Sequence, residues 1–171
     1  MNNNLIIINV LRFFALILLQ VLVLNNIQFS GYINPYVYVL FILMLPVQTP
    51  GWIVLISSFL LGISIDMFSD SLGLHATASV LIAFIRPNII NILSAKEAFV
   101  AGAYPVIKYY SLKWFLTYAL ILVLIHHSIL FYLEIFAFRE FFHTFLQVIA
   151  SSTATLILII IGQYMFYKPI K

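Results

Sequence analysis

Long apolar runs, interrupted by short polar breaks, dominate the chain from Leu5 to Phe166. A helix needs about 20 apolar residues to cross the roughly 30 Å of hydrocarbon in a bilayer. The breaks contain turn-forming residues, such as Asn25-Asn26, Asn34-Pro35 and Thr49-Pro50-Gly51. The pattern therefore predicts about six transmembrane helices, at residues 5–24, 36–49, 51–68, 74–91, 113–133 and 143–166.

Two of these runs differ from an ordinary span. The run at 36–49 is short, so a helix there would have little tilt or would thin the bilayer locally. The run at 5–24 stands where a signal peptide would, but it has no basic N-terminal region and is too long for the apolar core of one. Residues 25–28 are also no small-residue cleavage site. We therefore interpret the first run as a transmembrane helix.

Composition excludes a water-soluble fold. Of the 171 residues, 64% are hydrophobic and 8% are charged, and eight basic plus five acidic residues cannot cover a soluble core of this size. We expect an all-α membrane protein, a compact bundle that forms one domain over residues 1–171. Because the chain has no cysteine, the sequence offers no disulfide and no thiolate metal site. No basic stripe is interleaved with aromatic residues, so nucleic-acid binding has no support.

The basic residues predict the orientation, because lysine and arginine near the ends of spans stay on the cytoplasmic side. The connections after the first, third and fifth runs contain only Arg139. The other basic residues outside the first run lie between the last turns of the fourth run and the start of the fifth, or after the sixth run, namely Arg86, Lys96, Lys108, Lys113, Lys168 and Lys171. Six spans with both termini in the cytoplasm place this whole group inside.

Small and polar residues concentrate in the third and fourth runs. In the third run, Ser58, Gly62 and Asp66 recur every four residues and therefore share one helix face. The fourth run has small residues at spacings of three and four, and such residues let two helices approach closely. We predict a close hairpin whose helix-packing or partner-contact residues are Ser58, Gly62, Asp66, Ser69, Gly73, His75, Ala76, Ser79 and Ala83.

Two carboxylates and a histidine in this hairpin raise the question of chemistry. Asp66 and Asp70 are four residues apart and could form a general acid/base pair, or a metal site with His75. However, the two acids are neighbours on one helix end, and no second cluster completes a metal site. In the structural alternative, Asp66 accepts hydrogen bonds from Ser69, Ser71 or backbone amides and caps the turn. We favour this alternative, and we predict no catalytic residue, cofactor or metal.

Other polar residues in the spans have structural explanations. Arg12 lies about two turns into the first run and can extend toward the headgroups. For His126-His127, in the middle of the fifth run, we favour a hydrogen bond to a hydroxyl of Ser151–Thr155 over a proton relay or ligand site. An interfacial aromatic belt is predicted at the start of the fifth run, from Tyr104, Tyr109, Tyr110 and Trp114.

The connection from Arg86 to Lys113 is long enough for structure of its own. A helix along the inner membrane surface is suggested by Ile89, Ile90, Leu93, Lys96, Glu97 and Phe99. Gly102 and Pro105 would end this helix, which could be a docking surface or, as we favour, a lipid-bound connector. The sequence has no Walker loop, nucleophile elbow, His-Glu-x-x-His motif or dinucleotide fingerprint, so enzyme function has no positive support.

The hairpin resembles a known family. The residues from Leu61 to Ser69 (LGISIDMFS), followed by Leu72 to Ala76 (LGLHA), are similar to the signature hairpin of the MreD family of rod-shape-determining membrane proteins. The resemblance continues in order and spacing over roughly residues 33–87, through Ile33-Asn34-Pro35-Tyr36, Leu45-Pro46 and Ala83-Phe84-Ile85-Arg86-Pro87. Asp70 departs from the family pattern, which often has glycine there.

The resemblance implies a non-catalytic scaffold of the bacterial cell-elongation complex in the cytoplasmic (inner) membrane. Its expected partners are membrane lipid and an MreC-like bitopic protein, and indirectly an MreB-like filament and peptidoglycan synthases. The family is also similar in outline to the substrate-binding subunits of energy-coupling-factor transporters, which makes a small-ligand-binding subunit the second hypothesis. Against this hypothesis, the first run has only Ala15 where such subunits usually have a small-residue motif, and the short outer loops suggest no polar pocket.

Overall fold

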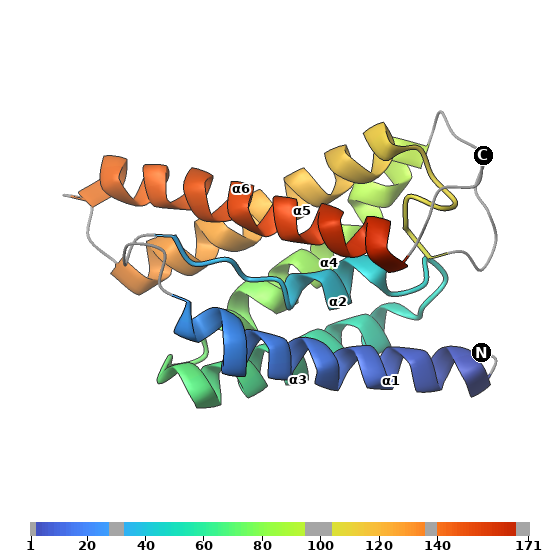
Figure 1. Cartoon of the computed structure of the whole chain (residues 1–171), viewed down its shortest axis with the longest axis horizontal. Helices are drawn as coiled ribbons and strands as arrows, with labels where there is room; N and C mark the ends of the chain where they lie inside the picture. Colours follow the sequence, from blue (N-terminus) through green and yellow to red (C-terminus); the bar gives the residue numbers. More distant parts are fainter. Residues whose placement is uncertain (1–2, 28–32, 95–103, 136–139, 167–171) are drawn as a thin grey trace.

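Five long helices surround a short one in the computed structural model (Figure 1). The structure describes residues 3–27, 33–94, 104–135 and 140–166, and these residues form helices and no strand. Helix α1 (Asn3–Leu18) continues into a π-helical turn, η1 (Leu19–Val23), and a 3-10 turn, η2 (Leu24–Asn26). The other helices are α2 (Val39–Met44), α3 (Gly51–Ser69), α4 (Leu74–Ser94), α5 (Leu112–Ile135) and α6 (Phe141–Phe166).

Five helices in the described part of the chain are long and apolar enough to cross a membrane. They span Ile6–Asn26, Gly51–Ser69, Leu74–Ser94, Leu112–Ile135 and Phe141–Phe166. The all-α class and the multi-pass membrane character predicted from the apolar runs are therefore confirmed, with five helices of spanning length. Helix α1 packs on α3, α3 on α4, α4 on α5, and α5 on α6.

The prediction of a continuous helix at 36–49 is wrong. Only Val39–Met44 is α-helical, and Pro46 and Pro50 lie between this helix and α3. Pro35 disfavours helical geometry at Asn34, so a helix cannot extend past Pro35 toward the N-terminus, and residues 37–38 form a turn before α2. The segment from Asn34 to Pro50 nevertheless runs the length of the bundle, from the end where η2 finishes to the end where α3 begins (Figure 1).

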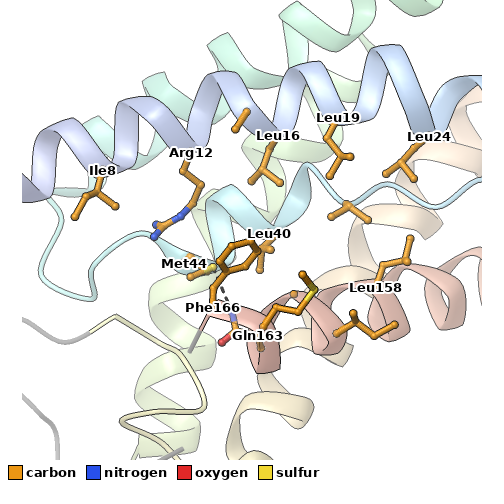
Figure 2. Close-up of a pocket in the computed structure, with 15 residues that line it drawn as sticks. Ile8, Arg12, Leu16, Leu19, Leu24, Leu40, Met44, Leu158, Gln163 and Phe166 are labelled. Atoms are coloured by element: carbon orange, nitrogen blue, oxygen red, sulfur yellow. Dashed lines mark hydrogen bonds between the residues drawn. The ribbon is translucent and has the colours of Figure 1, made fainter. Parts of the chain in front are cut away.

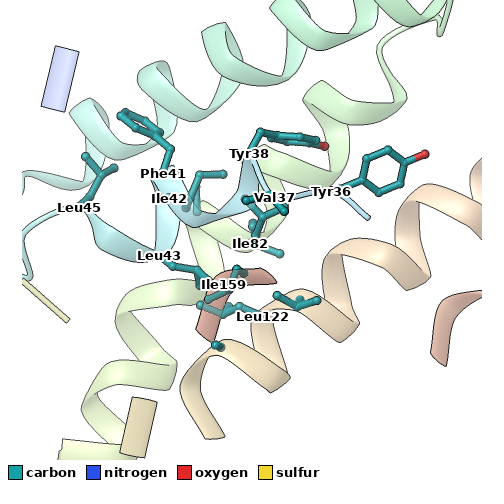
Figure 3. Packing of buried hydrophobic residues seen from close by; sticks show 14 of the residues in the cluster. Tyr36, Val37, Tyr38, Phe41, Ile42, Leu43, Leu45, Ile82, Leu122 and Ile159 are labelled. Atoms are coloured by element: carbon teal, nitrogen blue, oxygen red, sulfur yellow. The ribbon is translucent and has the colours of Figure 1, made fainter. Parts of the chain in front are cut away.

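This broken segment lies at the centre of the hydrophobic core. Between Val37 and Leu45 every side chain except Leu40 is buried. Figure 3 shows it beside Ile82 of α4, Leu122 of α5 and Ile159 of α6, all members of the same buried cluster. Lipid cannot hydrogen-bond free backbone groups, so irregular backbone at this depth is tolerated only where protein encloses it. The long helices provide that enclosure.

Helices α3 and α4 approach most closely at Gly62. A Cβ atom at this position would lie 2.6 Å from the backbone nitrogen of Ala76 and 2.7 Å from the carbonyl oxygen of His75. Both contacts are with backbone, which cannot move aside as a flexible side chain could. Of the other small residues predicted to pack, Ser58, Ala76, Ser79 and Ala83 are buried, whereas Ser69 at the end of α3 is exposed and Gly73 is partly buried.

The turn between α3 and α4 uses two left-handed residues. Asp70 has φ 51° and ends α3, with its N–H bonded to the carbonyl of Asp66, and Gly73 has φ 83°. Left-handed backbone is the conformation in which glycine is favoured and aspartate is tolerated. The aspartate at position 70 is therefore compatible with a tight turn.

The connection between α4 and α5 differs from its prediction. Ile89, Ile90 and Leu93 form the last turns of α4 instead of a surface helix, and Ile90 is only 2% exposed. Tyr110 and Trp114 are buried and stacked at 4.2 Å instead of forming an interfacial belt. Tyr109 is exposed and Tyr104 is partly buried. Several other residues named in the predictions lie outside the described part of the chain, namely Lys96, Glu97, Phe99, Gly102, Arg139, Lys168 and Lys171.

Replacing Gly62 by alanine is expected to destabilise the fold by about 1–3 kcal/mol, because the added methyl group must push the backbones of α3 and α4 apart. The loss is measured as a lower thermal midpoint of the detergent-purified protein. Gly162→Ala is the matched control, since a Cβ atom there meets nothing within 4 Å. Equal midpoints for the two variants would contradict the close helix contact.

Candidate functional site

Asp66 caps the start of α4. Its Oδ1 accepts hydrogen bonds from the Ser71 hydroxyl at 2.6 Å and from the backbone N–H of His75 at 3.0 Å. Its Oδ2 accepts a hydrogen bond from the backbone N–H of Ala76 at 2.9 Å. The first amides of a helix have no partner within the helix, and a carboxylate in this position satisfies them and interacts favourably with the helix dipole. The predicted capping role of Asp66 is present in the structure.

The arrangement does not bring Asp66 and Asp70 together as a catalytic pair. Asp66 is buried and both of its oxygens accept hydrogen bonds, whereas Asp70 is exposed at the end of α3. Among the described residues, no group of three or more histidines and carboxylates is placed to hold a metal ion. The backbone N–H of His75 donates a hydrogen bond to Asp66, whereas the His75 ring contacts the hydroxyl of Tyr38.

The hydroxyl of Tyr38 joins the central segment to α4 and α5 through two histidines. The hydroxyl of Tyr38, just before α2, lies 2.8 Å from Nδ1 of His75 on α4 and 2.8 Å from Nε2 of His126 on α5. Nδ1 of His126 has no partner. A buried lone pair is easier to leave unpaired than a buried N–H, so His126 donates to Tyr38 and Tyr38 donates to His75.

His127 makes the hydrogen bond expected for the histidine pair. Its Nε2 lies 3.1 Å from the hydroxyl of Thr155 on α6, and its Nδ1 lies 2.9 Å from the carbonyl of Val123 one turn earlier. The Thr155 hydroxyl also accepts a hydrogen bond from the backbone N–H of Tyr36 at 3.0 Å. His127 is therefore connected through Thr155 to the broken segment.

Side chains from two long helices satisfy the extended part of that segment. The N–H of Asn34 donates to the Ser151 hydroxyl of α6 at 3.1 Å. The carbonyl of Pro35 accepts a hydrogen bond from Nε2 of Gln20, in η1, at 3.0 Å. These groups replace the backbone partners that a continuous helix would supply, and each unsatisfied group would cost several kcal/mol in lipid.

Arg86 provides a hydrogen-bond partner for the backbone at the C-terminal end of α2. It donates through Nε to the Tyr118 hydroxyl at 2.9 Å and through a terminal nitrogen to the carbonyl of Leu45. Tyr118 in turn donates to the carbonyl of Leu43 at 3.0 Å. Arg86 is thus a buried core residue, and its assignment as a cytoplasmic loop charge is wrong.

Two of the cavities that flank the broken segment differ in character. A groove of about 760 Å³ lies between α1, α2 and α6, and Figure 2 shows Leu16, Leu40 and Leu158 among the residues that line it. Arg12 stands at one end of the groove, with its guanidinium over the Tyr104 ring. A second cavity, of about 420 Å³, is polar and lies among η1, η2 and the α3–α4 turn. The short outer loops suggested that the protein has no polar pocket on that side, and this cavity shows that the expectation is wrong.

Several buried polar residues were not singled out from the sequence, namely Gln20, Tyr38, Tyr118 and Gln163. Gln163 of α6 donates through Nε2 to the sulfur of Met44 in α2 at 3.3 Å. Gln20 and Gln163 are polar residues within apolar runs, and polar groups in spans are costly enough to require a partner. That signal was present for the two glutamines. The two tyrosines resemble ordinary core or interface aromatics and carried no such signal.

Comparison of the chain with protein-family models, with curated proteins and with solved structures finds no match.

Asp66→Asn is expected to lower the free energy of unfolding by about 1–3 kcal/mol. Asparagine has one acceptor oxygen instead of two, so its NH₂ group would face at least one of the N–H or O–H groups that now donate hydrogen bonds to Asp66. The measurement is the thermal midpoint of the purified protein. Asp70→Asn provides the control, since asparagine also tolerates the left-handed backbone at that exposed position. If Asp66→Asn were as stable as the control, the cap would be energetically unimportant.

Proposed function

We propose that this chain is a non-catalytic scaffold of the bacterial cell-elongation complex. In this role it lies in the cytoplasmic membrane, binds an MreC-like bitopic protein, and acts through it on an MreB-like filament and on peptidoglycan synthases. The role is the one that the MreD-like residues between 33 and 87 imply.

The observation that supports this proposal is that the MreD-like residues are architectural. Asn34, Pro35 and Tyr36 are held by hydrogen bonds to other helices, Asp66 caps α4, and Arg86 binds the carbonyl at the end of α2. Catalysis by a buried charged group would require that group to be free to reach a substrate. Both buried charges, Asp66 and Arg86, are instead used in hydrogen bonds within the chain.

The groove between α1 and α6 is our proposed surface for the partner's transmembrane helix. Five of the small residues predicted for packing, Ser58, Gly62, Ala76, Ser79 and Ala83, cannot serve, because they are buried within the bundle. The groove instead has a small residue of its own, Gly162, with open space beside it. Helix association in lipid depends on close packing, and a groove with a glycine in its wall permits it.

A small-ligand-binding subunit of an energy-coupling-factor-type transporter is the second candidate. The polar cavity beside the α3–α4 turn favours it, because a binding subunit needs such a pocket. The identity of the chain that co-purifies with this protein distinguishes the two candidates.

The charges of the described residues support an orientation in which the start of α1 and the end of α6, which lie at the same end of the bundle in Figure 1, face the cytoplasm. Helices α3 and α5 finish and α6 begins at one end of the bundle, so the acids next to these termini lie there, namely Asp70, Glu134 and Glu140. Helix α5 begins at the other end, with Lys108 just before its start and Lys113 in its first turn. The positive-inside rule then assigns the lysine end to the cytoplasm.

Single cysteines test this orientation in a chain that has none of its own. In intact cells, a membrane-impermeant maleimide is expected to label Glu140→Cys and to label Lys108→Cys only after permeabilisation, because the two exposed sites lie at opposite ends of the bundle. Protein extracted after labelling gives the readout. The reverse pattern would invert the proposed topology.

Gly162→Leu tests the scaffold role and its surface together. A leucine side chain would occupy the groove without a clash inside the fold, so we expect an intact protein that retains less of its MreC-like partner in detergent co-purification. The penalty expected for overfilling a packed contact, about 1–3 kcal/mol, corresponds to roughly five- to a hundredfold weaker binding.

Gly51→Leu is the matched control, because a Cβ atom there also meets nothing within 4 Å and Gly51 does not line the groove. Equal partner recovery from both variants would exclude the groove as the docking surface. Absence of an MreC-like bitopic protein from the wild-type preparation would contradict the scaffold role itself.

A further inference from the structure

The polar cavity of about 420 Å³ has walls from several parts of the fold. They come from η1 and η2, from residues 34–36, from the α3–α4 turn, and from the last turns of α5. Its size is within the range that small-molecule sites in proteins occupy. The scaffold role proposed above uses the groove on α1 and α6 and leaves this cavity unexplained.

The cavity is acidic. Asp70 and Glu134 are the charged residues among its described lining, which includes no lysine or arginine. The two carboxylates come from the end of α3 and the end of α5, so folding brings together acids that are far apart in the sequence. A cation is the complementary ligand for such a lining.

Gln20 provides an independent indication of a ligand. This side chain lines the cavity and is 1% exposed, and its Nε2 is fully used in hydrogen bonds to Asn25 Oδ1 at 2.9 Å and to the Pro35 carbonyl at 3.0 Å. Its Oε1 has no partner. A buried carbonyl oxygen without a donor is costly, and an N–H donor from a ligand would satisfy it.

The local backbone around Gln20 is also unusual. Gln20 belongs to η1, a π-helical turn of five residues, and such turns are rare and occur frequently at functional sites. The turn lets one polar side chain of an otherwise apolar helix bind the Pro35 carbonyl and line the cavity. Carboxylates and a free carbonyl oxygen are all acceptors, so the matching group on a ligand is a donor that carries positive charge.

A metal ion fits this lining poorly. No group of three or more histidines and carboxylates close enough to hold one occurs in the part of the chain that the structure describes. An ammonium group has several N–H donors and can contact acceptors that are spread over a wider space.

We propose that this cavity binds the ammonium group of a small amine or of a lipid headgroup. Glu134 and Asp70 provide the charge complement at the rim, and the Gln20 carbonyl oxygen accepts an N–H deeper inside. The two sources share the same chemistry and differ in whether an acyl chain follows the ammonium group.

The test uses the purified full-length chain in detergent, with putrescine and ethanolamine as amine probes and 1,4-butanediol as an uncharged control. Thermal midpoints measured against probe concentration give an apparent Kd, because a ligand that binds the folded state stabilises it. We expect the amines to raise the midpoint and the diol to leave it unchanged.

Glu134→Gln should weaken amine binding by about tenfold or more, which corresponds to the loss of a charged hydrogen bond. Both Glu134 and Asp70 are exposed, so Glu134→Gln and Asp70→Asn keep the fold. The matched control is Glu140→Gln, an exposed acid at the same end of the bundle that does not line the cavity.

The lipid source has its own arm. If the ligand is a headgroup, wild-type protein extracted from mixed vesicles retains phosphatidylethanolamine in preference to phosphatidylglycerol, putrescine displaces it, and Glu134→Gln loses the preference. Absence of both amine stabilisation and phosphatidylethanolamine retention would overturn the proposal. So would equal stabilisation by the diol, or an equal loss of binding in Glu134→Gln and Glu140→Gln.

Discussion

Lipid cannot hydrogen-bond a polypeptide backbone, and one segment of this protein crosses the bundle without being a complete helix. Residues 34–50 contain only six helical residues, so their free N–H and C=O groups need partners from elsewhere. Ser151 and Thr155 provide acceptors, and Gln20, Tyr118 and Arg86 provide donors. The placement of the long helices follows from this requirement, because each of these side chains must reach the central segment.

The same requirement explains why the buried polar residues leave little chemistry available. A carboxylate that caps a helix and an arginine that binds two oxygens are committed to the fold. Within the described residues, the capacity that remains is at the two cavities. One is an apolar groove open along α1 and α6, and the other is a polar cavity at the end of the bundle where α3 and α5 finish.

The two cavities have largely different linings, so the two occupants proposed above would contact different residues. Both nevertheless contact the first helix, since Leu24 lines each of them. The π-helical turn that carries Gln20 lies just before Leu24.

The sequence by itself determined the features that depend on local spacing. Apolar runs predicted the five long helices, and the positions of Asp66 and Ser71 predicted a cap. The histidines in the fifth run and the hydroxyl-bearing residues 151–155 in the sixth predicted the hydrogen bond that His127 makes with Thr155. These features involve one helix or helices joined by a short connection. Periodicity and hydrogen-bonding capacity along the chain are sufficient to find them.

Only the tertiary structure decided the features that join distant residues. The N–H of Tyr36 meets Thr155, 119 residues away, and Gln20 meets Pro35, 15 residues away. Such pairs leave no periodic signal, so the short second run was predicted to be a continuous helix and Arg86 to be a loop charge. Both interpretations failed for the same physical reason: an apolar run predicts burial, but the partners of its backbone are determined by how the other helices pack around it.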